Sequence, residues 1–237
     1  MLVTRTEPGA QQTAARLTAE RFTPVVSPVL RIEPLDHAQI DFTGAAGLIF
    51  TSANGVRAYT AAYTRRDLSA WCVGPASSDC AARAGFADVR NANGDAEALI
   101  NLIAREAGSE RGPGQGRLIH VANAAAAGEV VRKLQSLGLN AGFAALYETR
   151  EARVLTASAD RALAAGTLGA VLIHSAKAAG ALARLIAPGA APQLALAAIS
   201  APAAAPLAGR AWARQHIAAA PNEDALINAL RMCYTRN

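Results

Sequence analysis

The sequence predicts an α/β fold with two similar domains, each a parallel sheet flanked by helices. The first observation is an internal repeat: an apolar strand, a small polar turn and a helix start occur at residues 48–54 and again at 171–177. The second is the tetrapeptide Ala-Leu-Ile-Asn at residues 98–101 and 225–228. The third is the alternation of strand and helix patterns, typical of parallel sheets covered on both faces. The repeat is much longer than a solenoid unit, so we expect two facing domains with a site in the cleft between them.

The strand and helix patterns can be placed in chain order. We expect strands at residues 1–4, 29–32, 48–50, 71–73, 118–121, 144–149, 171–173 and 197–199, and helices at residues 7–19, 75–84, 96–106 and 127–137 and after residues 54, 175, 200 and 221. Apolar side chains at Val56, Tyr59 and Ala62 follow the helical period. Residues 2–4 also match residues 118–120, so the order along the chain is short unit, long unit, short unit, long unit.

Single residues mark where several of these elements end. Gly85 and Gly138 are placed to cap the C-termini of helices, and Asp95 is placed to cap an N-terminus. Pro34 is expected to break the strand before it, and Pro206 to shorten the helix after Ser200.

Composition restricts the classes of function. The 237 residues are 52% hydrophobic and 17% charged, which suits two packed domains and argues against disorder. The net charge of +5 comes from Arg, because only Lys133 and Lys177 are lysines. Arg suits bidentate recognition of carboxylate or phosphate. The Arg residues are scattered, however, and many are expected only to keep the surface soluble, so we expect no nucleic-acid partner.

Compartment and membrane association follow from the cysteines and the apolar segments. Three unspaced cysteines form neither a disulfide framework nor a zinc site. The N-terminus lacks a basic segment followed by an apolar one, and no apolar stretch is long enough to cross a bilayer. We therefore expect a cytoplasmic protein with no membrane partner.

The motifs of several enzyme classes are absent. No phosphate loop, zinc-binding HExxH or nucleophile elbow is present. The glycines of residues 111–116 precede a strand instead of following one, so we expect a surface loop and not a dinucleotide site. His120 and His174 are expected at strand ends, hydrogen-bonded or solvated, and carboxylates there are scarce. We expect neither a metal nor a cofactor.

Small polar residues instead follow the strands in both repeats. Thr51 to Asn54, Ser175 to Lys177 and Ser200 stand where a strand ends and a helix begins. Ligands of open α/β sheets bind beyond the carboxyl ends of strands, and helix N-termini attract anions. The simpler interpretation is that Ser52 and Ser175 only cap helices, worth about 1 kcal/mol each. Their recurrence in both repeats favours an anionic ligand.

These segments, taken in order, resemble the uroporphyrinogen-III synthase family over nearly the whole chain. The resemblance is carried by residues 2–5, 28–34, 48–56, 73–74, 146–149, 173–175 and 199–200 and by Pro221. It implies one domain of residues 1–35 plus 153–237 and an inserted domain of residues 38–147. Linkers at about residues 34–38 and 147–153 would form a two-stranded connection.

The resemblance also implies a reaction. Members of that family cyclise hydroxymethylbilane with inversion of ring D through a spiro intermediate, releasing water, in tetrapyrrole (heme) biosynthesis. Water loss is easy, so the protein mainly has to favour one ring closure over another, which positioning in a closed site can do. The resemblance implies no cofactor, leaves room for a transient contact with hydroxymethylbilane synthase, and fits a monomer. The alternatives are a non-catalytic two-lobed cytoplasmic protein that binds an anionic small molecule, and a glycosyl- or nucleotide-transferring enzyme, for which no acidic or nucleotide-binding motif is found.

Carried over residue by residue, the resemblance implies a set of site residues. Tyr147 would assist departure of the substrate hydroxyl as a hydrogen-bond donor; the alternative is a tyrosine packed at a domain junction. The substrate-binding residues would be Arg5, Thr51, Ser52, Asn54, Gly74, Ser175, Lys177 and Ser200. The chain departs from the family pattern at residues 201–206, at His174 and at residues 123–126.

Overall fold

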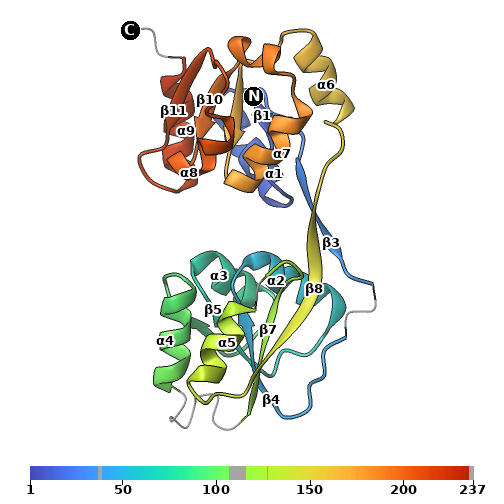
Figure 1. The fold of residues 1–237 in the computed structure, drawn as a ribbon, viewed down its shortest axis with the longest axis vertical. Coiled ribbons are helices and arrows are strands. Elements are labelled where there is room, and N and C mark those ends of the chain that lie inside the picture. The colour runs from blue at the N-terminus through green and yellow to red at the C-terminus, as the bar shows by residue number, and fades with distance from the viewer. Residues whose placement is uncertain (37–38, 107–115, 127, 235–237) are drawn as a thin grey trace. The chain divides into compact units, whose positions relative to one another are not determined.

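The computed structural model describes residues 1–36, 39–106, 116–126 and 128–234 (Figure 1). The chain forms two compact units: unit 1 is Met1–Arg31 with Arg150–Asn237, and unit 2 is Ile32–Thr149. The domain boundaries implied by the resemblance, 1–35 plus 153–237 and 38–147, stay a prediction. Except for Gly116, the predicted loop at residues 111–116 lies outside the described residues, as does residue 127 at the predicted start of a helix.

Unit 1 contains a five-stranded sheet in the order β11-β10-β9-β1-β2, with parallel pairing throughout. Its elements are β1 (Leu2–Val3), α1 (Gly9–Ala19), β2 (Val25–Val26), α6 (Ala157–Ala164), β9 (Ala170–Ile173), α7 (Ala176–Leu185), η1 (Pro188–Gln193), β10 (Ala195–Ala198), α8 (Ala201–Ala204), η2 (Ala205–Leu207), β11 (Arg214–Ile217) and α9 (Glu223–Met232).

Unit 2 contains a six-stranded sheet in the order β3-β8-β7-β4-β5-β6. Its elements are β3 (Leu30–Pro34), β4 (Ala45–Phe50), α2 (Ala53–Ala62), β5 (Ser69–Cys72), α3 (Pro75–Arg83), β6 (Val89–Asn91), α4 (Ala96–Glu106), β7 (Arg117–Asn123), α5 (Glu129–Ser136) and β8 (Ala141–Glu151).

The five strands of the unit 1 sheet follow the same order as five of the six strands of unit 2, in which β3 is an additional edge strand, and this confirms the predicted pair of similar α/β domains. Strands β9, β10 and β11 occupy the places that β4, β5 and β6 occupy in unit 2, and β1 and β2 match β7 and β8. The register corrects one detail of the predicted repeat. Leu2 pairs with Val171, whereas Ile119 pairs with Leu48, the repeat partner of Val171. Leu2 therefore matches Ile119 and not Leu118.

Helices cover both faces of each sheet. In unit 1, the core on one face joins β9 to α7 and α8, and the core on the other face joins it to α1 and α9. In unit 2, α2 and α3 cover one face, and α4 and α5 the other. Strand β9 is buried along its whole length, as expected for a parallel strand between two helical layers. Each large apolar side chain buried there, such as Leu172, stabilises the fold by about 1.5–3 kcal/mol.

Strands β3 and β8 pair with each other near the two chain segments where linkers were predicted, and the predicted linker bounds of about 34–38 and 147–153 stay a prediction. The Leu35 N–H donates to the Leu146 carbonyl at 3.0 Å, and the Ala152 N–H donates to the Val29 carbonyl at 2.9 Å. One strand advances as the other returns, so this pair is antiparallel. Pro34 was predicted to break the strand before it. In the structure, β3 instead includes Pro34 as its last residue. An edge strand tolerates proline because one side of its backbone needs no partner.

Most of the predicted helix ends are confirmed. Gly85 and Gly138 have φ of +92° and +80°, the left-handed conformation in which glycine carries no steric penalty. Asp95 Oδ1 accepts from the backbone N–H groups of residues 97 and 98. Before Pro206, α8 has four residues and gives way to a 3-10 turn, as predicted. Every helix among the described residues is too short or too polar to span a membrane.

Candidate functional site

The carboxyl end of β4 in unit 2 presents Thr51 and Ser52. Ser52 is extended, with φ −159° and ψ 155°, and its Oγ accepts from the Gly55 N–H at 3.2 Å. This is the predicted N-cap of α2. The helix also comes very close to β7 at this point, because a Cβ on Gly55 would lie 2.7 Å from the Val121 carbonyl oxygen. Glycine at position 55 therefore allows α2 to begin against the neighbouring strand.

Tyr147 reaches the same strand end from β8. Its side chain is 5% exposed, and its Oη lies 3.1 Å from Ser52 Oγ. The backbone there is fixed as well, because the Tyr147 carbonyl accepts from the Ala124 N–H at 2.8 Å. The fold thus joins two of the predicted site residues that are far apart in sequence.

Thr51 is engaged by a histidine in the neighbouring strand. Thr51 Oγ1 lies 3.1 Å from His120 Nε2. The prediction that His120 stands at a strand end is wrong. Strand β7 continues to Asn123, so His120 lies in the strand interior. The residue is 3% exposed, and this burial lowers the pKa of its imidazole to about 4. His120 is therefore neutral at pH 7.

The remaining predicted residues of unit 2 make local contacts. Asn54 Oδ1 accepts from Arg57 Nη1 at 2.9 Å in the first turn of α2. Gly74 precedes α3 in an extended conformation, and its N–H donates to Ser77 Oγ at 3.3 Å. The structure does not join either of them to Tyr147.

In unit 1, the predicted serines again cap helices. Ser175 Oγ accepts from the Ala178 N–H at 3.2 Å at the start of α7, and Ser200 Oγ accepts from the Ala203 N–H at 3.3 Å at the start of α8. Lys177 is exposed in the first turn of α7. The N-terminal features predicted from the repeat therefore occur in both units.

Unit 1 differs by an ionic cluster around Glu223, which the sequence analysis did not find. Glu223 Oε2 accepts from Arg5 Nη1 at 3.0 Å and lies 3.1 Å from His174 Nε2, while Oε1 accepts from Thr13 Oγ1 at 2.5 Å. Arg5 also donates to Thr13 at 3.3 Å. The predicted substrate-binding Arg5 is thus paired with an internal carboxylate.

The cluster controls the protonation of its carboxylate. Burial by itself would raise the pKa of Glu223, but hydrogen bonds from His174 and Thr13 and the charge of Arg5 outweigh burial and lower that pKa to about 2. Glu223 matches Ala96 in the other repeat, so the repeat carried no signal for it. Its position directly after the N-cap Asn222 was the available clue.

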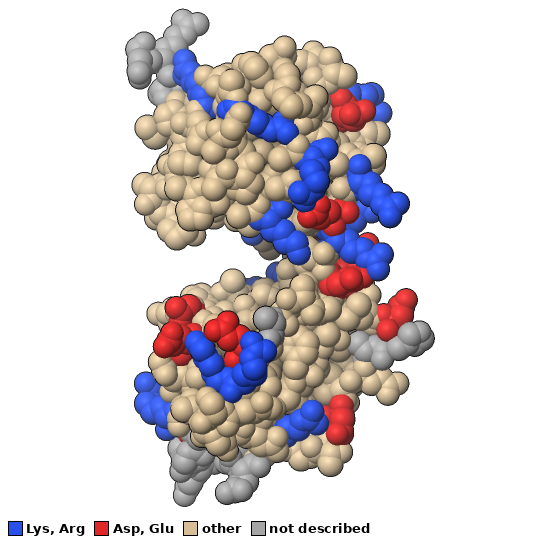
Figure 2. Space-filling model, viewed as in Figure 1, with Lys and Arg blue, Asp and Glu red and all other residues tan. Residues whose placement is uncertain are grey.

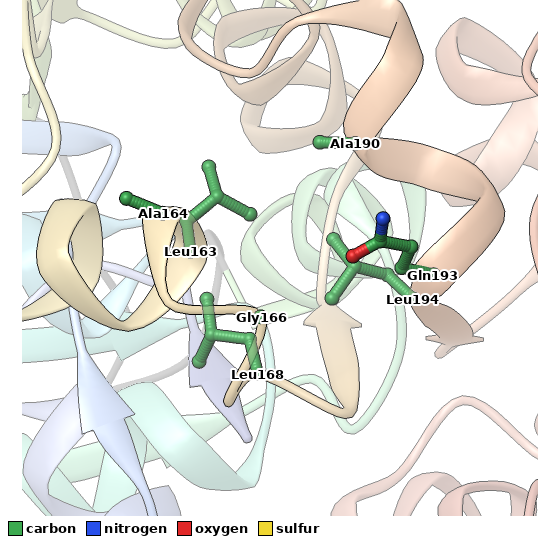
Figure 3. Close-up of a pocket in the computed structure, with 7 residues that line it drawn as sticks. All are labelled: Leu163, Ala164, Gly166, Leu168, Ala190, Gln193 and Leu194. Atoms are coloured by element: carbon green, nitrogen blue, oxygen red, sulfur yellow. The ribbon is translucent and has the colours of Figure 1, made fainter.

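Pockets found within unit 1 lie away from these residues. One of about 200 Å³ is bounded by Leu163 and Leu168 on one side and by Gln193 and Leu194 on the other (Figure 3). Leu168 and Leu194 come just before β9 and β10, so this pocket lies at the amino ends of the strands, opposite to the candidate residues. A second, of about 480 Å³, is lined by Arg153, Asp160 and Arg184 among others. Neither contains a predicted site residue.

Charge and metal-binding groups are sparse. On the face shown in Figure 2, basic and acidic side chains are interspersed among much uncharged surface. No group of three or more His, Cys, Asp or Glu side chains suited to a metal occurs within the part of the chain that the structure describes. The side chains described above at or near the strand ends are hydroxyls, an amide, two imidazoles and the Arg5–Glu223 pair.

The fold and these groups define an α/β protein of two like units, with small polar residues at the carboxyl ends of its parallel strands. The sequence matches the family model of uroporphyrinogen-III synthase HemD over residues 11–228. The chain therefore belongs to the uroporphyrinogen-III synthase family, and so to the cyclising hydro-lyases of heme biosynthesis, whose substrate is a small-molecule tetrapyrrole precursor.

Solved structures show the same fold at low sequence identity. The uroporphyrinogen-III synthetase of Helicobacter pylori aligns with a TM-score of 0.63 and 15% identity, over 89% of this chain and 93% of that one. A mutant uroporphyrinogen III synthase of the extremely thermophilic bacterium Thermus thermophilus aligns with a TM-score of 0.53 and 14% identity, over 97% and 98% of the two chains. No curated protein matches the sequence.

Proposed function

We propose that this protein converts hydroxymethylbilane into uroporphyrinogen III, with inversion of the last pyrrole ring through a spiro intermediate and release of water. Family membership supports the reaction class. At the level of residues, the proposal rests on the Tyr147–Ser52 contact at a strand end. The family match does not favour the non-catalytic anion-binding alternative.

Tyr147 is proposed to assist departure of the substrate hydroxyl. The C–O bond breaks as the hydroxyl gains a proton, and a pyrrole N–H loses one, so that water and an azafulvene result. Ser52 Oγ already accepts the Gly55 N–H, which leaves its own proton free to be donated to Tyr147 Oη. Tyr147 can then direct its proton to the leaving oxygen.

Burial supports this role for Tyr147. A side chain that is 5% exposed on a hydrogen-bonded strand has little freedom to move. A hydrogen bond given in a site with little water is stronger than the same bond in solution, and a fixed donor needs no reorganisation when charge develops. The main requirement is selection of one ring closure, which such rigid positioning serves.

Binding of the anionic substrate is proposed to use hydroxyls and helix N-termini together with two cations. The free N–H groups at the starts of α2, α3 and α7 favour carboxylates. The proposed carboxylate-binding residues are Arg5, Thr51, Ser52, Asn54, Gly74, Ser175, Lys177 and Ser200. Arg5 would bind while paired with Glu223, through the guanidinium N–H groups that Glu223 and Thr13 leave unused.

Assembly and location form part of the proposal. We propose that the protein acts as a cytoplasmic monomer that receives hydroxymethylbilane during a transient contact with hydroxymethylbilane synthase. Cys72, Cys80 and Cys233 are free thiols, which is usual in a reducing compartment. Light scattering across a range of protein concentrations tests whether the protein is a monomer. Transfer of hydroxymethylbilane from its synthase to this protein, in the presence of an additive that traps free substrate, tests the contact.

The deciding experiment supplies hydroxymethylbilane to the purified protein without any added cofactor. The substrate is generated enzymatically in the same vessel, and the porphyrinogens are oxidised and separated by chromatography into isomers. We expect the type III isomer to predominate, whereas a blank without the protein yields type I by spontaneous closure. Type I alone in both vessels would overturn the proposal.

A further inference from the structure

The contact of His120 with Thr51 leaves one buried nitrogen unused. His120 Nε2 faces Thr51 Oγ1 at 3.1 Å, while His120 Nδ1 is fully buried and has no hydrogen-bond partner. The ring of Phe143 packs edge-on against the imidazole, with centroids 5.7 Å apart, and carries no lone pair. One ring nitrogen therefore has a hydrogen-bond partner and the other has none. This difference indicates which nitrogen carries the single proton of the neutral ring.

Two tautomers are consistent with the contact. If the proton is on Nδ1, a buried N–H lacks an acceptor, and Nε2 accepts the proton of Thr51. If the proton is on Nε2, that nitrogen donates to Thr51 Oγ1, and Nδ1 is left with only a lone pair. Buried N–H groups without a partner are rarer in proteins than acceptors that lack a full set of donors. The Nε2–H tautomer is therefore favoured.

The tautomer decides what Thr51 offers to a ligand. A threonine hydroxyl has one proton, so a Thr51 that donates to His120 presents only lone pairs to a ligand, and these repel a carboxylate. A Thr51 that accepts from His120 keeps its proton free for a ligand. Because Thr51 is partly exposed at the carboxyl end of β4, that proton can be donated away from the sheet.

We propose that His120 is a positioning residue for the cyclisation: its Nε2–H donates to Thr51 Oγ1 and so makes Thr51 a hydrogen-bond donor to a carboxylate of the substrate. The proposal rests on the proposed function. The neighbouring Ser52 makes a second hydrogen bond of this region, with Tyr147 Oη, so two consecutive residues after β4 are engaged by side chains from β7 and β8.

Unit 1 carries different residues at the two equivalent positions. The sheet register places Val3 where unit 2 has His120, and the repeat places His174 where unit 2 has Thr51. His174 is engaged by Glu223 instead. The pairing of a threonine hydroxyl with a buried histidine therefore occurs at these positions in unit 2, where unit 1 has Val3 and His174. His120 also remains neutral in the working range of pH, because burial lowers the pKa of its ring to about 4.

The first test observes the proton directly in the wild-type protein. Long-range proton–nitrogen correlation spectra of protein labelled with ¹⁵N-histidine assign the tautomer of each imidazole, and a His120→Gln sample identifies the His120 signals. We expect His120 in the Nε2–H form at neutral pH. An Nδ1–H tautomer would overturn the proposal, whether or not the protein makes uroporphyrinogen III.

The second test uses two amides that differ in reach. The amide nitrogen of His120→Gln can occupy the place of Nε2, whereas that of His120→Asn corresponds to Nδ1 and cannot reach Thr51. We expect the Asn variant to raise the KM for hydroxymethylbilane about tenfold with little change in kcat, and the Gln variant to restore KM to within about threefold of wild type. Equal KM values for the two variants would contradict the proposal.

A double variant completes the design. Thr51→Val removes the hydroxyl with little change in shape, and we expect it to raise KM as much as His120→Asn does. Because both act through one hydrogen bond, the double variant should raise KM no further. If the increase in KM of the double variant equals the product of the two single increases, His120 acts independently of Thr51 and the proposal is wrong. If wild type makes no type III isomer, the proposed function fails, and the spectra still decide the hydrogen-bond direction.

Discussion

The two units share a scaffold, but their strand ends carry different chemistry. After β4, unit 2 has neutral hydroxyls engaged by Tyr147 and His120. At the corresponding place, unit 1 has His174 in an ionic cluster with Glu223 and Arg5. Serine caps recur at the same positions in both. The repeat has therefore retained the elements that build the sheet and its helix N-termini, while the groups suited to chemistry have diverged.

Tyr147→Phe should have the largest effect, because it removes the proposed donor from the neutral strand end. We expect kcat for uroporphyrinogen III to fall roughly 100-fold and the share of type I product to rise, as spontaneous closure competes. Steady-state kinetics with isomer separation measures both quantities.

Tyr59→Phe is the matched control for that variant. Tyr59 is a fully buried tyrosine of the same unit, and its Oη donates to the Arg65 carbonyl at 3.0 Å. The control should lose some stability and keep its kcat. If Tyr147→Phe also keeps its kcat, Tyr147 plays no part in the chemistry.

Glu223→Gln tests the charged strand end. The variant deprives Arg5 and His174 of their carboxylate, and we expect it to lower the free energy of unfolding by about 2 kcal/mol at pH 7. The pKa of Glu223 is about 2 in the folded protein, below the ordinary value of 4.5. The stabilisation is therefore complete above about pH 4.5 and is lost as the pH falls towards 2.

Urea denaturation of both proteins between about pH 5 and pH 3 measures this difference, which should narrow as the pH falls. Glu129→Gln is the control, because Glu129 also stands in the first turn of a helix but pairs with Lys133 at an exposed position. It should change stability by less than about 0.5 kcal/mol. A pH-independent difference for Glu223→Gln would mean that its carboxylate is not the stabilising group.

Ser52→Ala and Ser175→Ala compare equivalent caps. Each should lower the free energy of unfolding by about 1 kcal/mol, because each removes the acceptor for one helix N–H. Only Ser52 contacts Tyr147, so only Ser52→Ala should reduce kcat, by about tenfold, while Ser175→Ala should raise KM. Equal effects on kcat would remove the functional difference between the units.

The smallest effects on activity are expected at N-caps that occupy equivalent positions in the two units and make no contact with the strand-end residues. Asp95 and Asn222 hold equivalent N-caps, of α4 and α9. Replacing either with Ala should lower the free energy of unfolding by about 1 kcal/mol, and Asp95→Ala should leave the isomer ratio unchanged. Chemical denaturation and the isomer assay check this pair. A changed ratio in Asp95→Ala would show that scaffold and chemistry are coupled in unit 2.

Much of the fold could be predicted from sequence, because buried parallel strands and amphipathic helices have strong local periodicity. Strands β2, β6 and β11 escaped prediction because their signals of this kind are weak, and β2 is only two residues long. Strand β6 is three residues long, and only Val89 in it is apolar. Strand β11 is largely exposed, with only Ile217 apolar among its residues. All three strands lie at the edge of a sheet, where one neighbouring strand suffices.

The candidate site was predictable only where it depends on neighbouring residues. Ser52 and Ser175 were identified as caps because a cap acts within its own helix turn. The approach of Tyr147 to Ser52, and of Glu223 to Arg5, joins distant segments, and a single sequence has no signal for such contacts. His120 was placed at a strand end because the continuation of β7, Ala122-Asn123, resembles a turn.

The close approach of α2 to β7 has a consequence for how the protein can vary. A methyl group at position 55 would meet the Val121 carbonyl oxygen, which belongs to the backbone and cannot rotate away. Any larger residue would therefore displace the start of α2, and with it the cap that contacts Tyr147. In a saturation library selected for heme-dependent growth, position 55 should accept glycine alone, although glycine has no side chain that could take part in the reaction.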